Sequence, residues 1–191
     1  ATSGKACRWT CGRWPERVNI GKGRNESRGG LMGPVEYIAR IRDNYARLGY
    51  KPYNWVVNAD PAPWAPLSKP LSQCRLGLAA SGGIYLTGQV AFHYKDDASV
   101  RDIPTDVDPK ELRATHFAYD LSDARTDPNV VFPIDPLRRL VREGFLGGLA
   151  SRFYTFMGGI YSSRRVTEDL APRLTARFLE DGVDAVLLVP V

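Results

Sequence analysis

The sequence predicts an α/β fold: a three-layer open sheet that is mainly parallel, Rossmann-like and incomplete at its C-terminal edge. Two apolar runs have the composition of strands, CRLGLAA at residues 74–80 and DAVLLVPV at residues 184–191. Two amphipathic helical patterns lie between them. The order strand, loop, helix, helix, strand is typical of an open α/β sheet, and continuous apolar strands are typical of its parallel part.

The first element in chain order is a helix. Apolar residues recur at steps of three and four from position 35 to Leu48, and Gly49 can end the helix that they predict. Residues 51–73 contain five prolines and two tryptophans without a period, which predicts an extended, packed segment. The strand at 74–80 follows, and Cys74 within it is expected to be a small core residue.

The second half of the chain alternates loops with regular elements. Residues 88–130 are polar and loop-rich. Asp135 followed by Pro136 has the chemistry of an N-cap and a first helical residue, which predicts a helix that ends at Gly144. The aromatic run RFYTFMGG at 152–159 indicates a packed element that enters a loop. A second helix is expected at about 167–180, directly before the terminal strand.

The length and composition are those of one globular domain. The chain has 191 residues, of which 43% are hydrophobic and 25% charged. Its longest apolar run is far shorter than the roughly 20 residues of a membrane span, and its N-terminus has no apolar signal region. Three cysteines at no disulfide-framework spacing favour a reducing cytoplasm. We therefore expect a cytoplasmic protein without membrane contact.

Residues 1–31 differ from the rest of the chain. They hold seven basic and two acidic side chains, which accounts for the whole formal net charge of +5. Such an arm can bind phosphates, and Trp9 and Trp14 can stack on bases. The absence of periodicity, and a plausible start at Met32, favour instead a disordered tail or mistranslated upstream sequence, and no nucleic-acid partner. The domain itself is then residues 32–191.

Cys7 and Cys11 form a CxxxC pair without a second Cys/His pair nearby. A structural zinc site usually needs four such ligands. We therefore expect no metal site in this protein.

The tripeptide Ser81-Gly82-Gly83 follows the first strand directly. Backbone N–H groups at such a turn can bind an anion. Glycine is also the residue that a tight turn with positive φ requires. Both interpretations stay open, and a nucleotide site is not supported because no full GxGxxG or Walker pattern is present.

The segment THFAYD at 115–120 gathers an imidazole, a phenol and a carboxylate. His116 and Asp120 share one side of the segment whether it is extended or helical, so they can form a proton-transfer pair. A hydrogen-bonded structural histidine is the alternative. The other histidine, His93 in AFHYKDD, has less support as a site residue.

Five segments of the chain together resemble the selenoprotein B family of glycine, sarcosine, betaine and D-proline reductases. The order and spacing of the segments make the resemblance specific, and it spans about residues 33–191. Tyr85 is a departure, because relatives often carry histidine there, which puts a site role at this position in doubt. The segments are SGGIYLTGQVAFHYKDDASVRDIP (81–104), THFAYD (115–120), DPNVVFPIDPLRRLVREG (127–144), LGGLASRFYTFMGG (146–159) and GVDAVLLVPV (182–191).

The resemblance implies reductive cleavage of a carbon–nitrogen bond in a small amine or amino acid. In the family, a pyruvoyl group on a partner subunit activates the amine, and a selenolate or thiolate of the B-type subunit attacks the α-carbon. Selenium suits this step because a selenol is ionised at neutral pH, whereas a thiol with a pKa of about 8.5 mostly is not. The expected partners are the substrate, the pyruvoyl-type subunit and a selenoprotein A, and we expect no directly bound cofactor.

The same resemblance implies where the nucleophile lies. In the family a U/C-x-x-C redox pair follows the strand that corresponds to residues 184–191, so selenocysteine or cysteine is expected just after Val191 and no nucleophile is expected within the chain. Selenocysteine is encoded by UGA, which gene-calling reads as a stop. We therefore expect UGA after the codon of Val191, and we expect residues 32–191 to be a truncated reductase-type domain that is inactive alone.

The expected substrate-binding residues are Ser81, Gly82, Gly83, His116 and Tyr119, with His116 and Asp120 as the acid/base pair. Two other functions remain open from the sequence. A non-catalytic protein of this fold could keep the small-ligand pocket without the redox step. A nucleic-acid-binding protein could use the basic arm.

Overall fold

The computed structural model describes residues 36–51, 57, 59–61, 63 and 65–191. The chain divides into two compact units, Ala1–Trp55 and Val56–Val191. The expectations for residues 1–31, including the basic arm and its CxxxC pair, lie outside the described residues. Within the described part, no helix has the length and apolar character that crossing a membrane requires.

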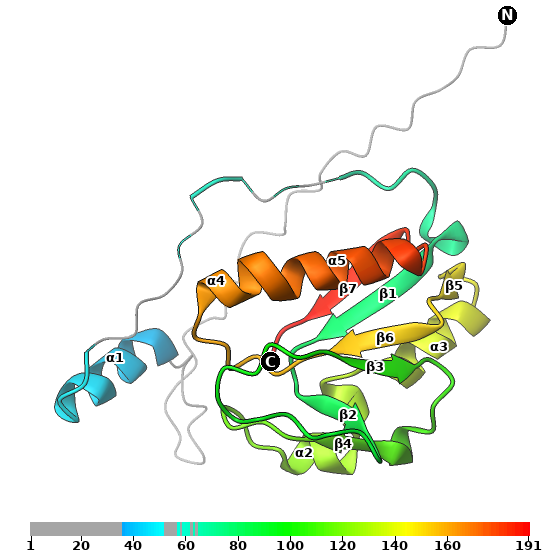
Figure 1. The fold of residues 1–191 in the computed structure, drawn as a ribbon. Coiled ribbons are helices and arrows are strands. Elements are labelled where there is room, and N and C mark those ends of the chain that lie inside the picture. Colours follow the sequence, from blue (N-terminus) through cyan, green and yellow to red (C-terminus); the bar gives the residue numbers. More distant parts are fainter. Residues whose placement is uncertain (1–35, 52–56, 58, 62, 64) are drawn as a thin grey trace, which may run out of the picture. The chain divides into compact units, whose positions relative to one another are not determined.

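In the first unit, the described element is α1, Tyr37–Arg47 (Figure 1). Two residues beyond the helix donate to carbonyls of its last turn. The Leu48 N–H donates to the Asn44 carbonyl at 3.1 Å, and the Gly49 N–H to the Ala46 carbonyl at 3.0 Å. Gly49 has a φ of +76°, the left-handed conformation that glycine supplies at a helix end. The predicted helix and its stop are confirmed.

The second unit is built around strand β1, Arg75–Ala80, of which all residues but the first are buried. Strands β5 (Gly148–Leu149), β6 (Arg152–Thr155) and β7 (Ala185–Val189) all pair with β1 in parallel. Strand β3, Arg101–Pro104, pairs with β6 in the antiparallel sense. The sheet order is β3-β6-β1-β5, with β7 also on β1. The α/β class and the mostly parallel sheet are confirmed, although the sheet is mixed; the Rossmann-like character stays a prediction.

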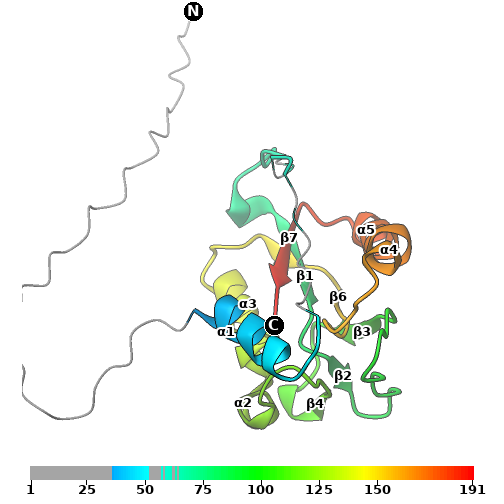
Figure 2. The same cartoon turned by 90° about the vertical axis from the view of Figure 1, so that its left-hand side faces the viewer.

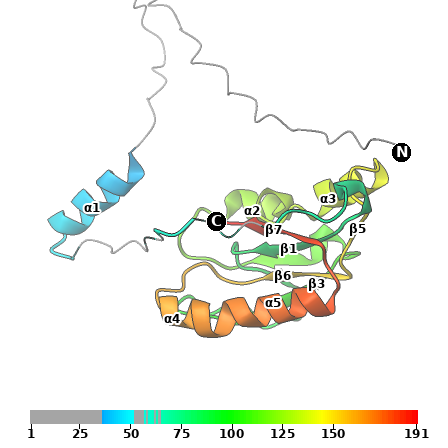
Figure 3. The ribbon, with the colours of Figure 1, turned by 90° about the horizontal axis from the view of Figure 1, so that it is seen from above.

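Helical elements cover both faces of this sheet (Figures 2 and 3). On one face, α4 (Ser163–Arg165), a π-helical turn (Val166–Leu170) and α5 (Ala171–Glu180) run on continuously. Three residues of this run, Leu170, Leu174 and Phe178, pack against Ala79 and Tyr154 of the sheet.

The opposite face holds the larger core. It is covered by α3 (Ile134–Arg142), α2 (Ser122–Thr126) and a small antiparallel pair, β2 (Ile84–Leu86) with β4 (Leu112–Ala114). The described part of the unit also contains single turns of 3-10 helix at Leu71–Gln73, Pro109–Glu111 and Pro128–Val130.

One local prediction needs correction. Residues 88–130 are loop-rich as expected, with β3, β4 and α2 as short elements among the loops. The aromatic run at 152–159 is a packed element that enters a loop, as expected, and that element is strand β6. Helix α3 begins at Ile134 and not after an Asp135 N-cap. The Asn129 side-chain oxygen instead accepts the Asp135 N–H at 2.9 Å, so Asn129 satisfies a donor of the first turn.

Strand β7 departs from the buried strand that its apolar composition predicted. Among the described residues it pairs with β1 alone. Val186, Leu187 and Leu188 are 39%, 37% and 69% exposed. Apolar β-branched composition favours a strand, but burial of that strand requires neighbours on both of its faces. The strand and its parallel direction were correctly predicted, whereas its burial was not.

Candidate functional site

The carboxyl ends of β1 and β7 lie side by side, because the two strands pair in parallel register up to Ala80 and Val189. The Ser81 N–H donates to the Val189 carbonyl at 3.0 Å. In return, the Val191 N–H donates to Ser81 Oγ at 2.9 Å. The serine that follows β1 therefore holds the end of β7. Carboxyl ends of parallel strands are the usual place for ligands in open α/β sheets.

The positive φ expected in residues 81–83 is confirmed at Gly83, where the chain turns away from β1. Gly82 forms an isolated antiparallel bridge with Met157 rather than a tight hydrogen-bonded turn. Gly83 has a φ of +66°, and a Cβ there would lie 2.0 Å from the Thr115 carbonyl oxygen. The Gly83 N–H donates to the Phe156 carbonyl at 3.1 Å, and the Gly83 carbonyl accepts from Thr115 N–H at 3.0 Å. Glycine is thus required both by the backbone conformation and by the close approach of a neighbouring chain.

These same bonds correct the expected role of the turn as an anion cradle. The amides of Ser81 and Gly83 donate to backbone carbonyls, so neither is available to a ligand. Of the three amides in the turn, that of Gly82 alone has no acceptor among the described residues. At most one backbone donor of the turn therefore remains for a ligand.

His116 is buried beside this turn, with 9% of its surface exposed. Its Nδ1 accepts the Ala118 N–H at 3.0 Å, so the neutral ring carries its proton on Nε2. That Nε2 is buried and has no hydrogen-bond partner within the described part of the chain. Burial lowers the pKa of His116, which keeps the ring neutral at pH 7. A buried N–H without an acceptor costs free energy unless a ligand or water bonds it.

Tyr119 joins the two sequence motifs. Its hydroxyl donates to the Gly82 carbonyl at 2.8 Å across 37 positions of sequence. Its ring also lies 4.8 Å from the His116 ring, centroid to centroid. Burial raises the pKa of Tyr119, against a smaller lowering by the Arg125 charge, so the phenol stays protonated as a donor. The structure therefore brings His116, Tyr119 and the 81–83 turn together, as the sequence predicted.

Asp120 does not form the proton-transfer pair that was expected with His116. Its Oδ1 accepts the Ser122 N–H at 2.9 Å and the Ser122 hydroxyl at 2.7 Å. These two bonds, with a smaller contribution from Arg125, lower the pKa of the exposed Asp120 carboxyl. The carboxylate organises the start of α2, which is why a carboxylate occurs at this position. The expected His116–Asp120 hydrogen bond is therefore not formed among the described residues, and the acid/base role of Asp120 stays a prediction.

The glycine/sarcosine/betaine reductase selenoprotein B family matches residues 55–191. The chain belongs to this family. It is 36% identical over 128 residues to the D-proline reductase subunit gamma of Acetoanaerobium sticklandii, covering 67% of this chain and 53% of the relative. It is 29% identical over 197 residues to the sarcosine reductase complex component B subunit beta of Peptoclostridium acidaminophilum, covering 85% and 43%.

A third relative is the glycine reductase complex component B subunit gamma of Carboxydothermus hydrogenoformans. It is 30% identical over 138 residues, covering 68% of this chain and 31% of the relative. The chain therefore spans about half the length, or less, of these curated relatives. No solved structure matches it significantly.

The loop after β6 packs against residue 81 and the segment of His116. The Gly158 N–H donates to the Ser81 carbonyl at 3.0 Å. A Cβ at Gly159 would lie 2.1 Å from the Phe117 ring, so that ring rests directly on the glycine backbone. The sequence pattern predicted this loop but no site residue in it. The two glycines that follow the aromatic run are the feature that could have indicated a close approach of another segment.

The remaining candidates lie apart from this cluster or on its margin. The Tyr85 hydroxyl accepts a hydrogen bond from the Thr115 hydroxyl at 3.3 Å, and so contacts the residue before His116. His93 is exposed and bonds within its own loop. Cys74 is 1% exposed and donates to the Pro70 carbonyl at 3.3 Å, which confirms it as a core residue. No group of three potential metal ligands occurs among the described residues.

Proposed function

We propose that this chain is part of a B-type subunit of a selenol- or thiol-dependent reductase. The reaction is the reductive cleavage of a carbon–nitrogen bond in a small amine or amino acid of the glycine, sarcosine, betaine or D-proline type. The observation that supports this most is the junction of β1 and β7. There the end of β7 is hydrogen-bonded to Ser81, beside a buried His116 whose Nε2–H lacks an acceptor among the described residues.

The junction suits the chemistry that family membership suggests. A redox pair that follows β7 would emerge next to residues 81–83, since Val191 is already bonded to Ser81. The nucleophile would attack the substrate α-carbon, and the electrons of the broken carbon–nitrogen bond would leave with the amine, which takes up a proton. A pyruvoyl group, if this complex uses one, would be supplied by a partner subunit and would activate the amine.

His116 is the side chain of this chain that we propose to contact the substrate. As a neutral imidazole, it can donate its Nε2 proton to a substrate carboxylate or to the departing amine. Tyr119 then acts as a positioning residue, because its hydroxyl is committed to Gly82. This gives His116 its acid/base role without Asp120.

The test uses the full subunit, assembled with its partner subunits. His116→Ala should lower turnover about tenfold or more, the usual contribution of a positioned acid/base group. His93→Ala is the matched control, because that ring is exposed and lies outside the site. Equal turnover of His116→Ala and the parent enzyme, with normal circular dichroism, would exclude the assignment.

The location of the nucleophile is a separate proposal. Among the described residues the one thiol is that of Cys74, which is buried. We propose that in the full subunit a selenocysteine or cysteine follows the strand that corresponds to β7, with a second cysteine three positions later. The sequence of the full subunit decides it: the absence of a U/C-x-x-C motif after this strand would contradict the proposal. Consistently, the 191-residue chain alone should release no amine from the four substrates with dithiothreitol.

One observation favours a second function. Among the described residues, His116 has an unpartnered Nε2 that could bind a ligand, whereas the one thiol, that of Cys74, is buried. A non-catalytic protein of this fold would bind the small ligand and release it unchanged. Calorimetric binding of glycine, sarcosine, betaine or D-proline, without turnover in the assembled complex, would favour this function over the reductase.

A further inference from the structure

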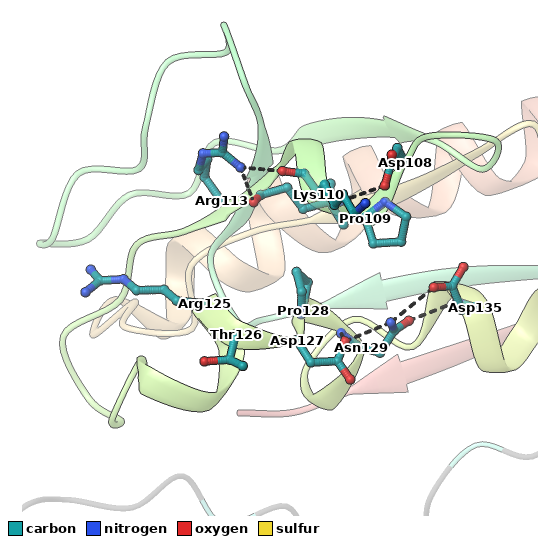
Figure 4. A pocket seen from close by; sticks show the side chains of 11 residues that line it. Asp108, Pro109, Lys110, Arg113, Arg125, Thr126, Asp127, Pro128, Asn129 and Asp135 are labelled. Atoms are coloured by element: carbon teal, nitrogen blue, oxygen red, sulfur yellow. Dashed lines mark hydrogen bonds between the residues drawn. The ribbon is translucent and has the colours of Figure 1, made fainter.

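Two hollows of the second unit differ in their chemistry. The hollow beside β4 and α2 is polar (Figure 4), and its Asp108 and Asp127 already accept backbone amides at 3.0 Å. The other is a groove of about 400 Å³ between α5 and β7, and its described lining residues are all apolar or glycine except Thr175. A groove of apolar side chains gains free energy when another apolar surface covers it.

Strand β7 forms one wall of the groove. Val186 and Leu188 line it, whereas Ala185 and Val189 pack into the core on the opposite face of the sheet, as the alternation of a strand requires. Both groove residues are exposed, and in the described part of the chain no strand pairs with the outer edge of β7. An apolar strand of a parallel sheet is normally covered on both faces, so β7 lacks a neighbour here.

Helix α5 forms the other wall, and this side of the helix carries no charge. Arg177 of α5 forms an ion pair with Asp102 of β3, toward the other edge of the sheet. The groove side instead presents Ala171 and Thr175, which are exposed. Small uncharged side chains allow a second helix to approach α5 closely, because the distance between packed helices depends on the side chains at the contact.

The order of the strands indicates on which face a further helix would lie. Strands β6 and β7 both pair with Ala79 and Ala80 of β1, so they lie on opposite edges of β1, and α5 connects them across one face of the sheet (Figure 1). Crossovers between parallel strands are right-handed in about 98% of cases. A helix that leads from β7 to a strand further out continues in the same direction, and it therefore lies on the α5 face, over Val186 and Leu188.

We propose that in the full subunit the groove between α5 and β7 holds an amphipathic helix of the same polypeptide, which leads to a further parallel strand on the outer edge of β7. The proposal rests on the proposed function in one respect, that this chain is part of a longer B-type subunit. The curated relatives are long enough to supply these elements, because the chain spans about half their length or less. The apolar stripe of the helix contacts Leu188 on one wall and Thr175 on the other.

The experiment measures how fast iodoacetamide labels single introduced cysteines in the purified full subunit, resolved by peptide in mass spectrometry. Thr175→Cys and Leu188→Cys probe the two walls of the groove. Each should react about tenfold more slowly than the control, or more slowly still, since labelling of a covered thiol requires local opening. Ala176→Cys is the matched control, because Ala176 is exposed on α5 and does not line the groove.

In the 191-residue chain the three introduced cysteines should react at similar rates, because all three positions are exposed. Equal rates in the full subunit would overturn the proposal. So would equal protection in the 191-residue chain, which would mean that a segment of this chain covers the groove, or protection that is lost on dilution, which would indicate a second copy. These rates do not depend on turnover, so a failure here is distinguishable from a failure of the His116→Ala test.

Discussion

Gly83→Ala tests the packing of the candidate site directly. The substitution asks alanine to adopt a φ of +66° and places its Cβ 2.0 Å from the Thr115 carbonyl oxygen. That oxygen belongs to the backbone, and the Thr115 N–H is bonded to the Gly83 carbonyl at 3.0 Å. The clash can be relieved only by separating the two chain segments, which also moves His116.

The expected loss of stability has two parts. The left-handed conformation destabilises the alanine variant by about 1–2 kcal/mol. Alanine also lowers the conformational entropy of the unfolded chain, which offsets about 0.4–1 kcal/mol of this loss. The clash adds about 1–3 kcal/mol, the usual range for overpacking. Gly88→Ala isolates the first part, because Gly88 has a φ of +93° but its Cβ would meet nothing within 4 Å. The difference between the two variants is therefore the clash.

Thermal unfolding followed by circular dichroism measures this difference. In a chain of this length, 1 kcal/mol shifts Tm by about 2–4 °C, so Gly83→Ala should melt about 2–12 °C below Gly88→Ala. If the two variants melt at the same temperature, the close approach of Thr115 to the turn is not a rigid feature of the site. Residues 81–83 and 115–120 would then not form one packed unit.

Three further predictions concern the sheet and the site. Gly77→Ala places a Cβ 2.7 Å from the buried aromatic ring of α5 and should cost about 1–3 kcal/mol in urea unfolding; Gly148→Ala, whose Cβ meets nothing within 4 Å, should cost nothing, and equal stability of the two would contradict the packing. Tyr154→Phe removes a hydrogen bond to the Asp181 carboxylate and should lower the free energy of unfolding by about 1.5–3 kcal/mol, so an unchanged urea midpoint would refute that role. Burial lowers the pKa of His116, so below a pH of about 6.5 the unfolded chain binds more protons than the folded chain, and the free energy of unfolding should decrease as the pH is lowered. His116→Asn should remove this part of the pH dependence, and an unaltered pH profile would contradict the prediction.

The longer elements could be predicted because their patterns are local. The steps of three and four in α5 and the apolar run of β1 report which residues of these elements are buried. In α1 the same steps predicted the helix, although none of its described residues is buried. Strands β2 and β4 have three residues each, too few for an alternation to be recognised. They exist because they pair with each other, and that pairing joins positions about thirty residues apart.

The candidate site divides in the same way. The sequence indicated that residues 81–83 form a turn and that 115–120 carry polar chemistry, and the Tyr119–Gly82 bond joins them. It also suggested a His116–Asp120 pair, because spacing alone allows one. The competing partner of Asp120 was Ser122, two residues away, and a carboxylate this close to a helix start bonds the local donors first.

By itself, then, the sequence determined the α/β class, the family, the glycine turn after β1 and the parallel strand at 185–189. These follow from periodicity, composition and the order of motifs, which are properties of neighbouring residues. The tertiary structure alone decided that Val186 to Leu188 are exposed and that His116 Nε2 is buried without an acceptor among the described residues. Burial and charge pairing depend on which distant segments become neighbours, and no local pattern contains that information.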